Sequence, residues 1–379
     1  MSYTGMYDKG DHIDTGIGGT RKINTAGKPS SGTFSSIPVI DLTDATSPSL
    51  DARKKVAQEV YEACVNVGFF YIKNHGVPDE AIASIKHEAK RFFHEQSEED
   101  KMNLDISKNT EFYGYAPIKP KLENGRAKTR MFESINFGYE PSMDPGASTT
   151  EDNGPNFWPS EEKLPNFKAN VGKYYSAVMD LSRQLLHMFA LSLNLEETFL
   201  DKFCKKPGVL LKLNHYPAVV PDSSDSAGIH AHSDLESKRL RFTYQVELES
   251  LHSPPGFTIL LQDDVKSLEV LSKDGHWIPA DPIPGTFVVN IGDAMSMWTN
   301  NLFLSTIHRA YNKEGKVRYS VPFFFGADYD AVMETLPSCI DEMRPVKYKP
   351  ITAGEYVRMK LNNTYPKAVG KVAAEVSVA

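Results

Sequence analysis

Cysteine is scarce in this chain of 379 residues, which contains only Cys64, Cys204 and Cys339. Three thiols at such wide spacing are too few for a disulfide framework, and they do not form the clusters that bind metals through sulfur. This usage is typical of proteins in a reducing compartment. We therefore expect a cytoplasmic location.

Long apolar runs and an excess of positive charge are also missing. No stretch approaches the roughly 20 apolar residues that cross a bilayer, and the first residues, MSYTGMYDKGDHIDTG, contain no apolar signal-peptide core. The formal net charge is −7, which opposes binding to phosphate backbones. We therefore expect neither a membrane nor a nucleic acid as partner, and predict a monomer that acts on a small molecule.

The first half of the ordered chain has the spacing of helices. Residues 1–36 are rich in Gly, Ser, Thr and Lys and show no apolar periodicity, so we expect a loose N-terminal arm. Apolar residues then recur at helical spacing in three segments. These segments carry the sets Val56, Val60, Cys64 and Val67; Ile82, Ile85, Ala89, Phe92 and Phe93; and Val171, Tyr174, Val178, Leu181 and Leu185.

From Val209 onward the pattern changes to short β-rich runs separated by Gly, Pro, Asp and Asn. The runs are VLLKLNHY, FTILLQ, LEVLS, TFVVNIG and VRYSVPFFFG. Such strands predict an α+β fold with a jelly-roll core and supporting helices, mainly N-terminal. We expect a single domain at 37–366, with a helical part at 37–205, a jelly-roll part at 206–330 and a C-terminal tail at 367–379.

Two His-x-Asp pairs occur, and one or two His-x-acid pairs are expected by chance from 11 histidines and 49 acidic residues. The pair His12/Asp14 lies in the N-terminal arm, where no rigid element would orient it. The pair His232/Asp234 follows a predicted strand, and alternation on an extended backbone would turn both side chains to one side. A surface turn is the simpler alternative for this second pair.

The segment NNLFLSTIHRAYNKEGKVRYSVPFFF adds a third candidate ligand, His308. Two imidazoles and one carboxylate leave three positions of an octahedral metal open, which suits non-haem Fe(II) and O2 chemistry. Arg318 and Ser320 are two residues apart and share a face of a strand, where they can bind a carboxylate by charge-assisted hydrogen bonds.

These blocks resemble the 2-oxoglutarate- and Fe(II)-dependent dioxygenases of the isopenicillin N synthase-like family. The similarity runs from IPVIDL to NNTYP, through GFFYIKNHGVP, LKLNHYP, HSD, TILLQD, VVNIGDAMSMWTNN, STIHRA and VRYSVPFFF. The resemblance implies a double-stranded β-helix in which His232, Asp234 and His308 hold iron.

The resemblance also implies the remaining cofactor contacts. 2-Oxoglutarate would chelate the iron through its keto group and adjacent carboxylate, and its far carboxylate would meet Arg318 and Ser320. Asn214 and Tyr216 match the family's Asn-x-Tyr and would reach the same cosubstrate. With O2, the enzyme would form succinate and CO2 while it hydroxylates, desaturates or rearranges a small organic substrate of specialised metabolism. His230 is an alternative ligand outside the family pattern.

An insertion separates HSDLES from FTILLQD, which otherwise form one family block. Removing residues 238–256 restores the block. The codons of Ser237-Lys238 can contain an intron donor and those of Pro255-Gly256 an acceptor, and splicing between them would keep the reading frame. We therefore interpret the segment as a translated, unspliced intron. The alternative is a genuine lid.

Two other functions remain open, namely an iron oxidase that uses no 2-oxoglutarate and a non-catalytic jelly-roll protein inactivated by this insert. For the substrate pocket, we expect the candidate lining residues Phe112, Tyr115, Phe132 and Phe324, which could equally belong to the core.

Overall fold

The computed structural model describes most of the chain between residues 33 and 364. The described residues are 12–14, 20–24, 33–108, 113–118, 120–123, 126–129, 132–147, 156–218, 228–234, 255–312 and 314–364. The predicted C-terminal tail, 367–379, and residues 238–254 of the predicted insert lie outside these ranges, as does Phe112.

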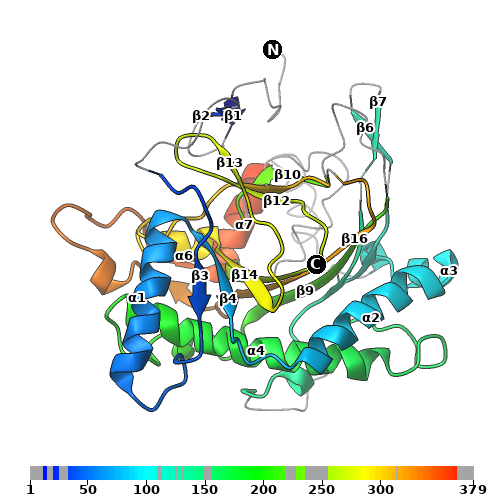
Figure 1. Ribbon diagram of the computed structural model, residues 1–379, viewed down its shortest axis with the longest axis horizontal. Coiled ribbons are helices and arrows are strands. Elements are labelled where there is room, and N and C mark those ends of the chain that lie inside the picture. Colours follow the sequence, from blue (N-terminus) through cyan, green and yellow to red (C-terminus); the bar gives the residue numbers. More distant parts are fainter. Residues whose placement is uncertain are drawn as a thin grey trace, which may run out of the picture.

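Two facing sheets form the core of the fold (Figure 1). The larger sheet contains, in spatial order, β3 (Val39–Asp41), β4 (Phe69–Lys73), β14 (Thr286–Ile291), β11 (Pro255–Gln262), β16 (Arg318–Gly326), β9 (Gly208–Tyr216), β8 (Glu133–Phe137) and β5 (Gly114–Ala116). The smaller sheet contains β10 (Ile229–His232), β15 (His308–Ala310), β12 (Leu268–Leu271) and β13 (Trp277–Pro279). This arrangement confirms the predicted jelly roll.

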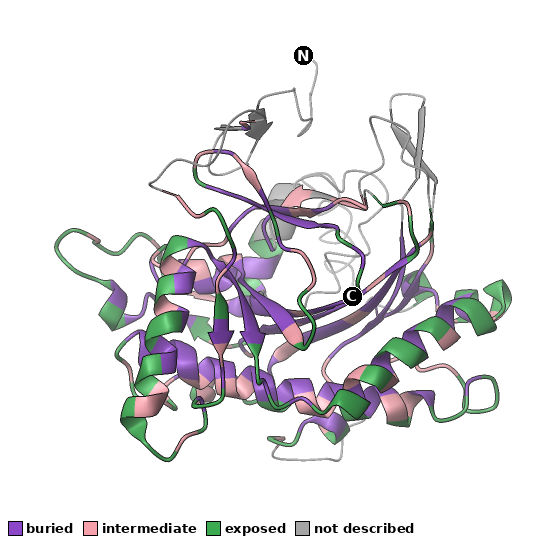
Figure 2. Cartoon of the chain, in the orientation of Figure 1, coloured by how far each residue is buried: buried purple, intermediate pink, exposed green. Residues whose placement is uncertain are grey.

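Helices cover the outer face of the larger sheet, on the side away from the smaller sheet (Figure 1). The main ones are α1 (Leu50–Asn66), α2 (Asp79–Glu95) and α4 (Phe167–Ser192); elsewhere the chain forms the helices α3 (Glu98–Asn103), α6 (Asp293–Trp298) and α7 (Ala353–Thr364). The apolar stripes predicted from the sequence are buried, and α1 and α2 both pack against α4. Figure 2 shows the consequence, with exposed residues on the outward sides of α1 and α2 and buried residues throughout the large sheet.

The end of α1 depends on Gly68, as its position after the apolar stripe predicts. Gly68 has φ +76°, a conformation that disfavours side chains. A Cβ at this position would also lie 2.2 Å from the carbonyl oxygen of Leu304. The glycine therefore allows the chain to turn directly from α1 into β4, beside the segment that leads to His308.

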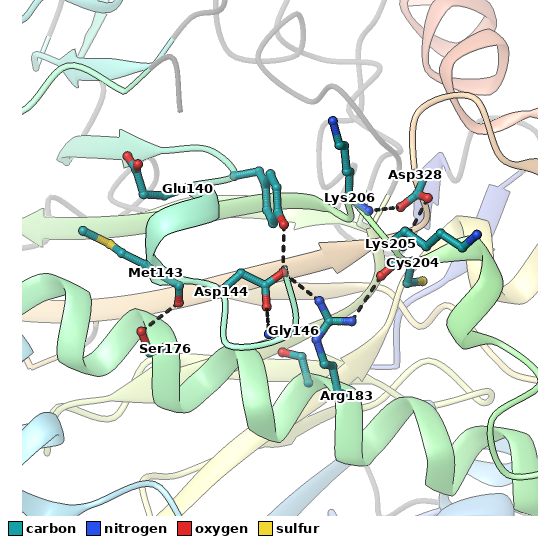
Figure 3. Close-up of polar contacts among 12 residues, drawn as sticks. Glu140, Met143, Asp144, Gly146, Ser176, Arg183, Cys204, Lys205, Lys206 and Asp328 are labelled. Carbon is teal, nitrogen blue, oxygen red and sulfur yellow. Dashed lines mark hydrogen bonds and ion pairs between the residues drawn. The ribbon is translucent and has the colours of Figure 1, made fainter. Parts of the chain in front are cut away.

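A polar cluster fixes α4 to the connection that follows β8 (Figure 3). The buried carboxylate of Asp144 accepts a hydrogen bond from Arg183 Nη2 at 2.7 Å and another from the Tyr139 hydroxyl at 2.8 Å. Arg183 also donates to the Cys204 carbonyl oxygen at 3.2 Å, just before β9. These contacts fix the distance between the long helix and the strands that carry part of the site.

Two predicted segments contain more strand structure than the sequence indicated. The arm at 1–36, predicted to be loose, includes the short antiparallel strands β1 (His12–Asp14) and β2 (Thr20–Lys22). The strand predicted from FTILLQ begins two residues earlier than expected, because Pro255 and Gly256 at the end of the predicted insert belong to β11, where Pro255 pairs with Gly326 of β16. Strand pairing with the existing sheet therefore extends β11 into the predicted insert.

The remaining short elements lie at the edges of this core. They are β6 (Pro120–Glu123), β7 (Arg126–Thr129), β17 (Val332–Met333), β18 (Ile351–Thr352) and four 3-10 turns at Ile106–Lys108, Pro141–Met143, Asp201–Phe203 and Pro337–Cys339. Within the described residues no helix is both long enough and apolar enough to cross a membrane.

Candidate active site

The smaller sheet brings His232, Asp234 and His308 together. Strand β10 pairs with β15 so that His232 lies opposite His308, and Asp234 follows β10 by two residues. The distance to Asp234 Oδ1 is 3.8 Å from His232 Nε2 and 3.5 Å from His308 Nε2. One ligand atom from each residue lies within 4.8 Å of the others, a spacing that a single metal ion can bridge.

Hydrogen bonds orient two of these side chains. Asp234 Oδ2 accepts hydrogen bonds from Thr258 Oγ1 and Asn290 Nδ2, each at 2.6 Å. His308 Nδ1 lies 3.1 Å from the carbonyl oxygen of Thr306, which requires a proton on that nitrogen. Asp234 Oδ1 and His308 Nε2 are thereby left to face the same point.

The electrostatics of the group favour a cation. Burial raises the pKa of Asp234, but the hydrogen bond with His308, the charges of both histidines and the hydrogen bond from Thr258 outweigh it and hold that pKa well below its usual range. Burial lowers the pKa of His308, but its contacts with Asp234 raise it above the ordinary value. An anionic carboxylate beside two imidazoles is the donor set of a non-haem iron site.

Residues of β9 and β16 form a second group. In the register of these strands Arg318 lies opposite Tyr216, and Ser320 lies opposite Asn214. Asn214 Nδ2 donates to Ser320 Oγ at 3.2 Å, so the hydroxyl proton of Ser320 is free to bind a ligand. The guanidinium carbon of Arg318 lies 4.8 Å from the centre of the Tyr216 ring.

Arg318 is buried without a counterion. Its side chain is 2% exposed, and its Nε and Nη1 have no hydrogen-bond partner. Within the described part of the chain it forms no salt bridge; its charge acts on the more distant carboxylate of Asp263, whose pKa is raised by burial and lowered by Arg318. The Oδ1 of Asn214 is also buried and unpaired. An unpaired buried cation is costly, so the Arg318 guanidinium fits an anionic ligand such as the distal carboxylate of 2-oxoglutarate, whereas the Asn214 oxygen can only accept a hydrogen bond.

All seven residues that the sequence predicts for the site line one cavity of about 80 Å³. The rest of its wall is mainly apolar and includes Phe69, Ile229, Leu260, Leu268, Ala310, Pro322 and Phe324. A larger hollow of about 520 Å³ lies between α1 and the end of α4, but none of the seven residues borders it. Cavity volume alone would therefore favour the larger hollow, whereas the candidate metal ligands and Arg318 identify the smaller cavity as the candidate site.

The aromatic residues predicted as candidates for the substrate pocket lie in different parts of the fold. Phe324 borders the cavity. Phe132 stacks on Tyr216, with the ring centres 4.9 Å apart, and so supports a residue that lines the cavity. For Tyr115 the core alternative holds, because this residue is buried in the main core and donates to Glu133 Oε2 at 2.5 Å. The side chain of His230 lies outside the described residues.

Sequence reasoning missed Thr258 and Asn290. The two residues lie directly opposite each other on β11 and β14. The available signal was a polar residue within each of the apolar runs FTILLQ and TFVVNI, because polar side chains inside buried strands require partners. Which partner they share depends on the strand register, which the sequence does not state.

The comparisons with known proteins identify the family of the chain. Residues 37–161 match the family model described as non-haem dioxygenase in morphine synthesis N-terminal, and residues 207–327 match the 2OG-Fe(II) oxygenase superfamily. The 2-oxoglutarate-Fe(II) type oxidoreductase ppzC of Metarhizium majus is 34% identical over 341 residues, which cover 87% of this chain and 88% of that protein. The homoarginine-6-hydroxylase 2-ODD-233 of Oryza sativa is 30% identical, covering 86% of this chain and 97% of that protein.

Solved structures share the fold. A full-length Neurospora crassa protein, crystallised in complex with alpha-KG and thymine, superposes with a TM-score of 0.74 at 24% identity and covers 89% of this chain and 99% of that one. A 2OG-Fe(II) oxygenase family protein from Caulobacter crescentus has a TM-score of 0.70 at 26% identity, with 87% and 99% covered.

The fold and donor set define a non-haem iron oxygenase. The chain belongs to the 2-oxoglutarate- and Fe(II)-dependent oxygenase superfamily, with an isopenicillin N synthase-like architecture. It is an enzyme that uses Fe(II) and 2-oxoglutarate to oxygenate small substrates.

A buried ionic cluster supports the second group from the opposite face of the sheet. His215 lies between Asn214 and Tyr216 in sequence, so its side chain points away from the cavity. His215 Nδ1 lies 2.7 Å from Glu133 Oε1, and Lys101 Nζ lies 3.2 Å from Glu133 Oε2. Burial raises the pKa of Glu133, but contacts with His215, Tyr115 and Lys101 outweigh it and lower that pKa below its ordinary value of 4.5.

The variant Glu133→Gln should therefore lose stability in a pH-dependent way. Because the folded-state pKa is lowered, the contribution of Glu133 is complete above about pH 4.5 and is lost as the pH falls through the folded-state value. We expect a loss of about 3 kcal/mol at pH 7, since Lys101 loses the buried one of its two carboxylate partners, and a difference from wild type that shrinks in acid. Urea unfolding of both proteins between pH 7 and pH 3 measures it.

Glu98→Gln is the control, because Glu98 contacts the same Lys101 Nζ but its side chain is 78% exposed. This variant should lose far less stability. A Glu133→Gln deficit that stays constant with pH would contradict the assignment of the charge to Glu133.

Proposed function

We propose that His232, Asp234 and His308 are the iron ligands of this enzyme. The supporting observations are the 3.5 and 3.8 Å contacts with Asp234 Oδ1 and the orientation of Asp234 by two hydrogen bonds. His308 Nδ1 carries a proton and donates it in a hydrogen bond to the Thr306 carbonyl oxygen. The lone pair of Nε2 is therefore available to the metal.

In the same proposal Arg318, Ser320, Asn214 and Tyr216 bind 2-oxoglutarate. The guanidinium group pairs with the distal carboxylate, Ser320 donates its free hydroxyl proton to it, and Tyr216 supports the guanidinium plane. Fe(II), 2-oxoglutarate and O2 together supply the oxidising power, with release of succinate and CO2. The apolar residues of the wall exclude water from the reacting atoms.

The substrate that fits this wall is a small organic molecule with an apolar portion. Phe69, Leu260 and Phe324 border the cavity together with the proposed ligands, so an apolar carbon would be held next to the metal. The proposed reaction is hydroxylation, desaturation or ring rearrangement in specialised metabolism. We propose that the enzyme works as a cytoplasmic monomer.

The observation that carries this function is the buried, unpaired guanidinium of Arg318 in the same cavity as the metal-binding cluster. The test is to incubate the Fe(II) protein with 2-oxoglutarate, O2 and a panel of small metabolites, and to measure succinate by mass spectrometry. Substrate-dependent succinate supports the proposal. Substrate oxidation without succinate would instead indicate an iron oxidase.

Arg318→Ala should weaken 2-oxoglutarate binding by about 3 to 5 kcal/mol, because the distal carboxylate is left buried without a partner. This corresponds to a loss of about a hundredfold or more. Arg318→Lys should recover only part of the affinity, since a point charge cannot form the bidentate contact. Iron binding should be unchanged. The measurement is a titration of 2-oxoglutarate into the anaerobic Fe(II) protein, followed by absorption.

Arg309→Ala is the matched control. Arg309 also lies on a strand of the jelly roll, but it pairs with Glu269 at 2.7 Å and does not border the cavity. Its removal should leave 2-oxoglutarate affinity at the wild-type level. Equal affinities of Arg318→Ala and wild type would remove Arg318 from the cosubstrate site.

We also propose that the insert at 238–256 is not needed for metal binding. Asp234 receives its contacts from Thr258 and Asn290, which belong to the sheet. A chain lacking residues 238–256 should therefore bind Fe(II) with wild-type affinity, with Glu236 and Ser237 replacing Pro255 and Gly256 at the start of β11. Isothermal titration of both proteins measures this, and weaker binding by the shortened chain would identify the segment as a functional part of the site. Sequencing the transcript tests its origin as an unspliced intron.

A further inference from the structure

The two oxygens of the Asp234 carboxylate have different partners. Its Oδ2 accepts two hydrogen bonds of 2.6 Å, from the Thr258 hydroxyl and the Asn290 amide. The two donors are a directly opposed pair on adjacent strands β11 and β14, and each is 4% exposed. The other carboxylate oxygen of Asp234, Oδ1, faces His232 and His308 instead.

The main chain of Asp234 is held by the same part of the fold. The backbone N–H of Asp293 donates to the Asp234 carbonyl oxygen at 3.2 Å, and Asp293 follows Asn290 by three residues. The N–H of Gly292 donates to the Gly256 carbonyl oxygen at 2.9 Å, which joins this turn to β11. Strands β11 and β14 thus hold the carboxylate of Asp234, and the first residue of α6, which follows β14, holds its backbone.

We propose that Thr258 and Asn290 are positioning residues that restrict Asp234 to binding the metal through Oδ1 alone. This inference rests on the proposed function, in which Asp234 is an iron ligand. Neither Thr258 nor Asn290 has to touch the metal or the substrate for this role. Both residues act through the carboxylate that they hold.

The restriction matters because of the number of coordination positions. Two imidazoles and one carboxylate oxygen leave three positions of an octahedral metal open. A cosubstrate that chelates takes two of them, and one remains for O2. If Asp234 bound through both oxygens, it would occupy one of these positions itself. Turning Oδ2 toward the metal requires breaking two charge-assisted hydrogen bonds at once, and such bonds are among the strongest in proteins.

Near-isosteric variants test the proposal. Thr258→Val and Asn290→Leu remove the two donors and keep the side-chain shape, whereas Thr258→Ser keeps the hydroxyl. Thr299→Val is the matched control, because Thr299 is also fully buried and donates a hydrogen bond of 2.8 Å, but to the Met295 carbonyl oxygen within α6. Each protein is loaded anaerobically with Co(II) as the probe metal, and thermal melting verifies folding.

Two measurements follow, the Co(II) absorption spectrum without cosubstrate and the 2-oxoglutarate affinity by calorimetry. We expect Thr258→Val and Asn290→Leu to change the spectrum and to weaken 2-oxoglutarate binding about tenfold or more, a size taken from the usual loss of metal affinity or activity when a residue that orients a metal ligand is removed. Thr258→Ser and Thr299→Val should behave as wild type. A purely structural role would lower the melting temperature and leave both measurements unchanged.

Wild-type spectra and affinities in Thr258→Val and Asn290→Leu would overturn the inference while leaving the proposed function intact. If Asn290→Leu does not fold, Thr258→Val decides alone. The proposed function fails separately, if the wild-type protein does not bind Co(II) and 2-oxoglutarate together.

Discussion

Burial of the Asp234 carboxylate is the constraint on which the site depends. A carboxylate that is 6% exposed loses most of its hydration, and this loss must be offset by hydrogen bonds and by positive charge. Thr258 and Asn290 supply two hydrogen bonds, and the imidazoles of His232 and His308 face the other oxygen. Every one of these partners comes from a different strand, so the jelly roll has to assemble before the carboxylate is stabilised.

Arg318 is a buried charge of the opposite sign in the same cavity, and its burial also has to be offset. It is a buried cation without a counterion among the described residues, whereas Asp234 is a buried anion within a set of donors suited to a metal. In the proposed site, Fe(II) beside Asp234 and a dianionic cosubstrate beside Arg318 would offset both costs. This reciprocal arrangement would explain why both charged residues border one cavity of only about 80 Å³.

The sequence predicted what depends on local order along the chain. Helical spacing predicted α1, α2 and α4, and the β-rich runs predicted the strands of the jelly roll. Of the seven proposed site residues, the candidate metal ligands, Arg318 and Ser320 were predicted from spacing and chemistry, and Asn214 and Tyr216 from the family resemblance. Thr258 and Asn290 were missed because their role depends on the pairing of β11 with β14. The sequence left Tyr115 open between pocket and core, because its partner, Glu133, lies on the neighbouring strand β8. The start of β11 was misplaced because pairing with β16 extends it to Pro255.

The most direct test is a crystal structure of the anaerobic protein with Mn(II), which occupies such sites without reacting, and 2-oxoglutarate. The account predicts Mn(II) bound to His232, Asp234 and His308, with the far carboxylate of 2-oxoglutarate on Arg318 and Ser320. It also predicts that only Oδ1 of Asp234 reaches the metal. Metal bound elsewhere, or a 2-oxoglutarate carboxylate that does not contact Arg318, would contradict the central claim.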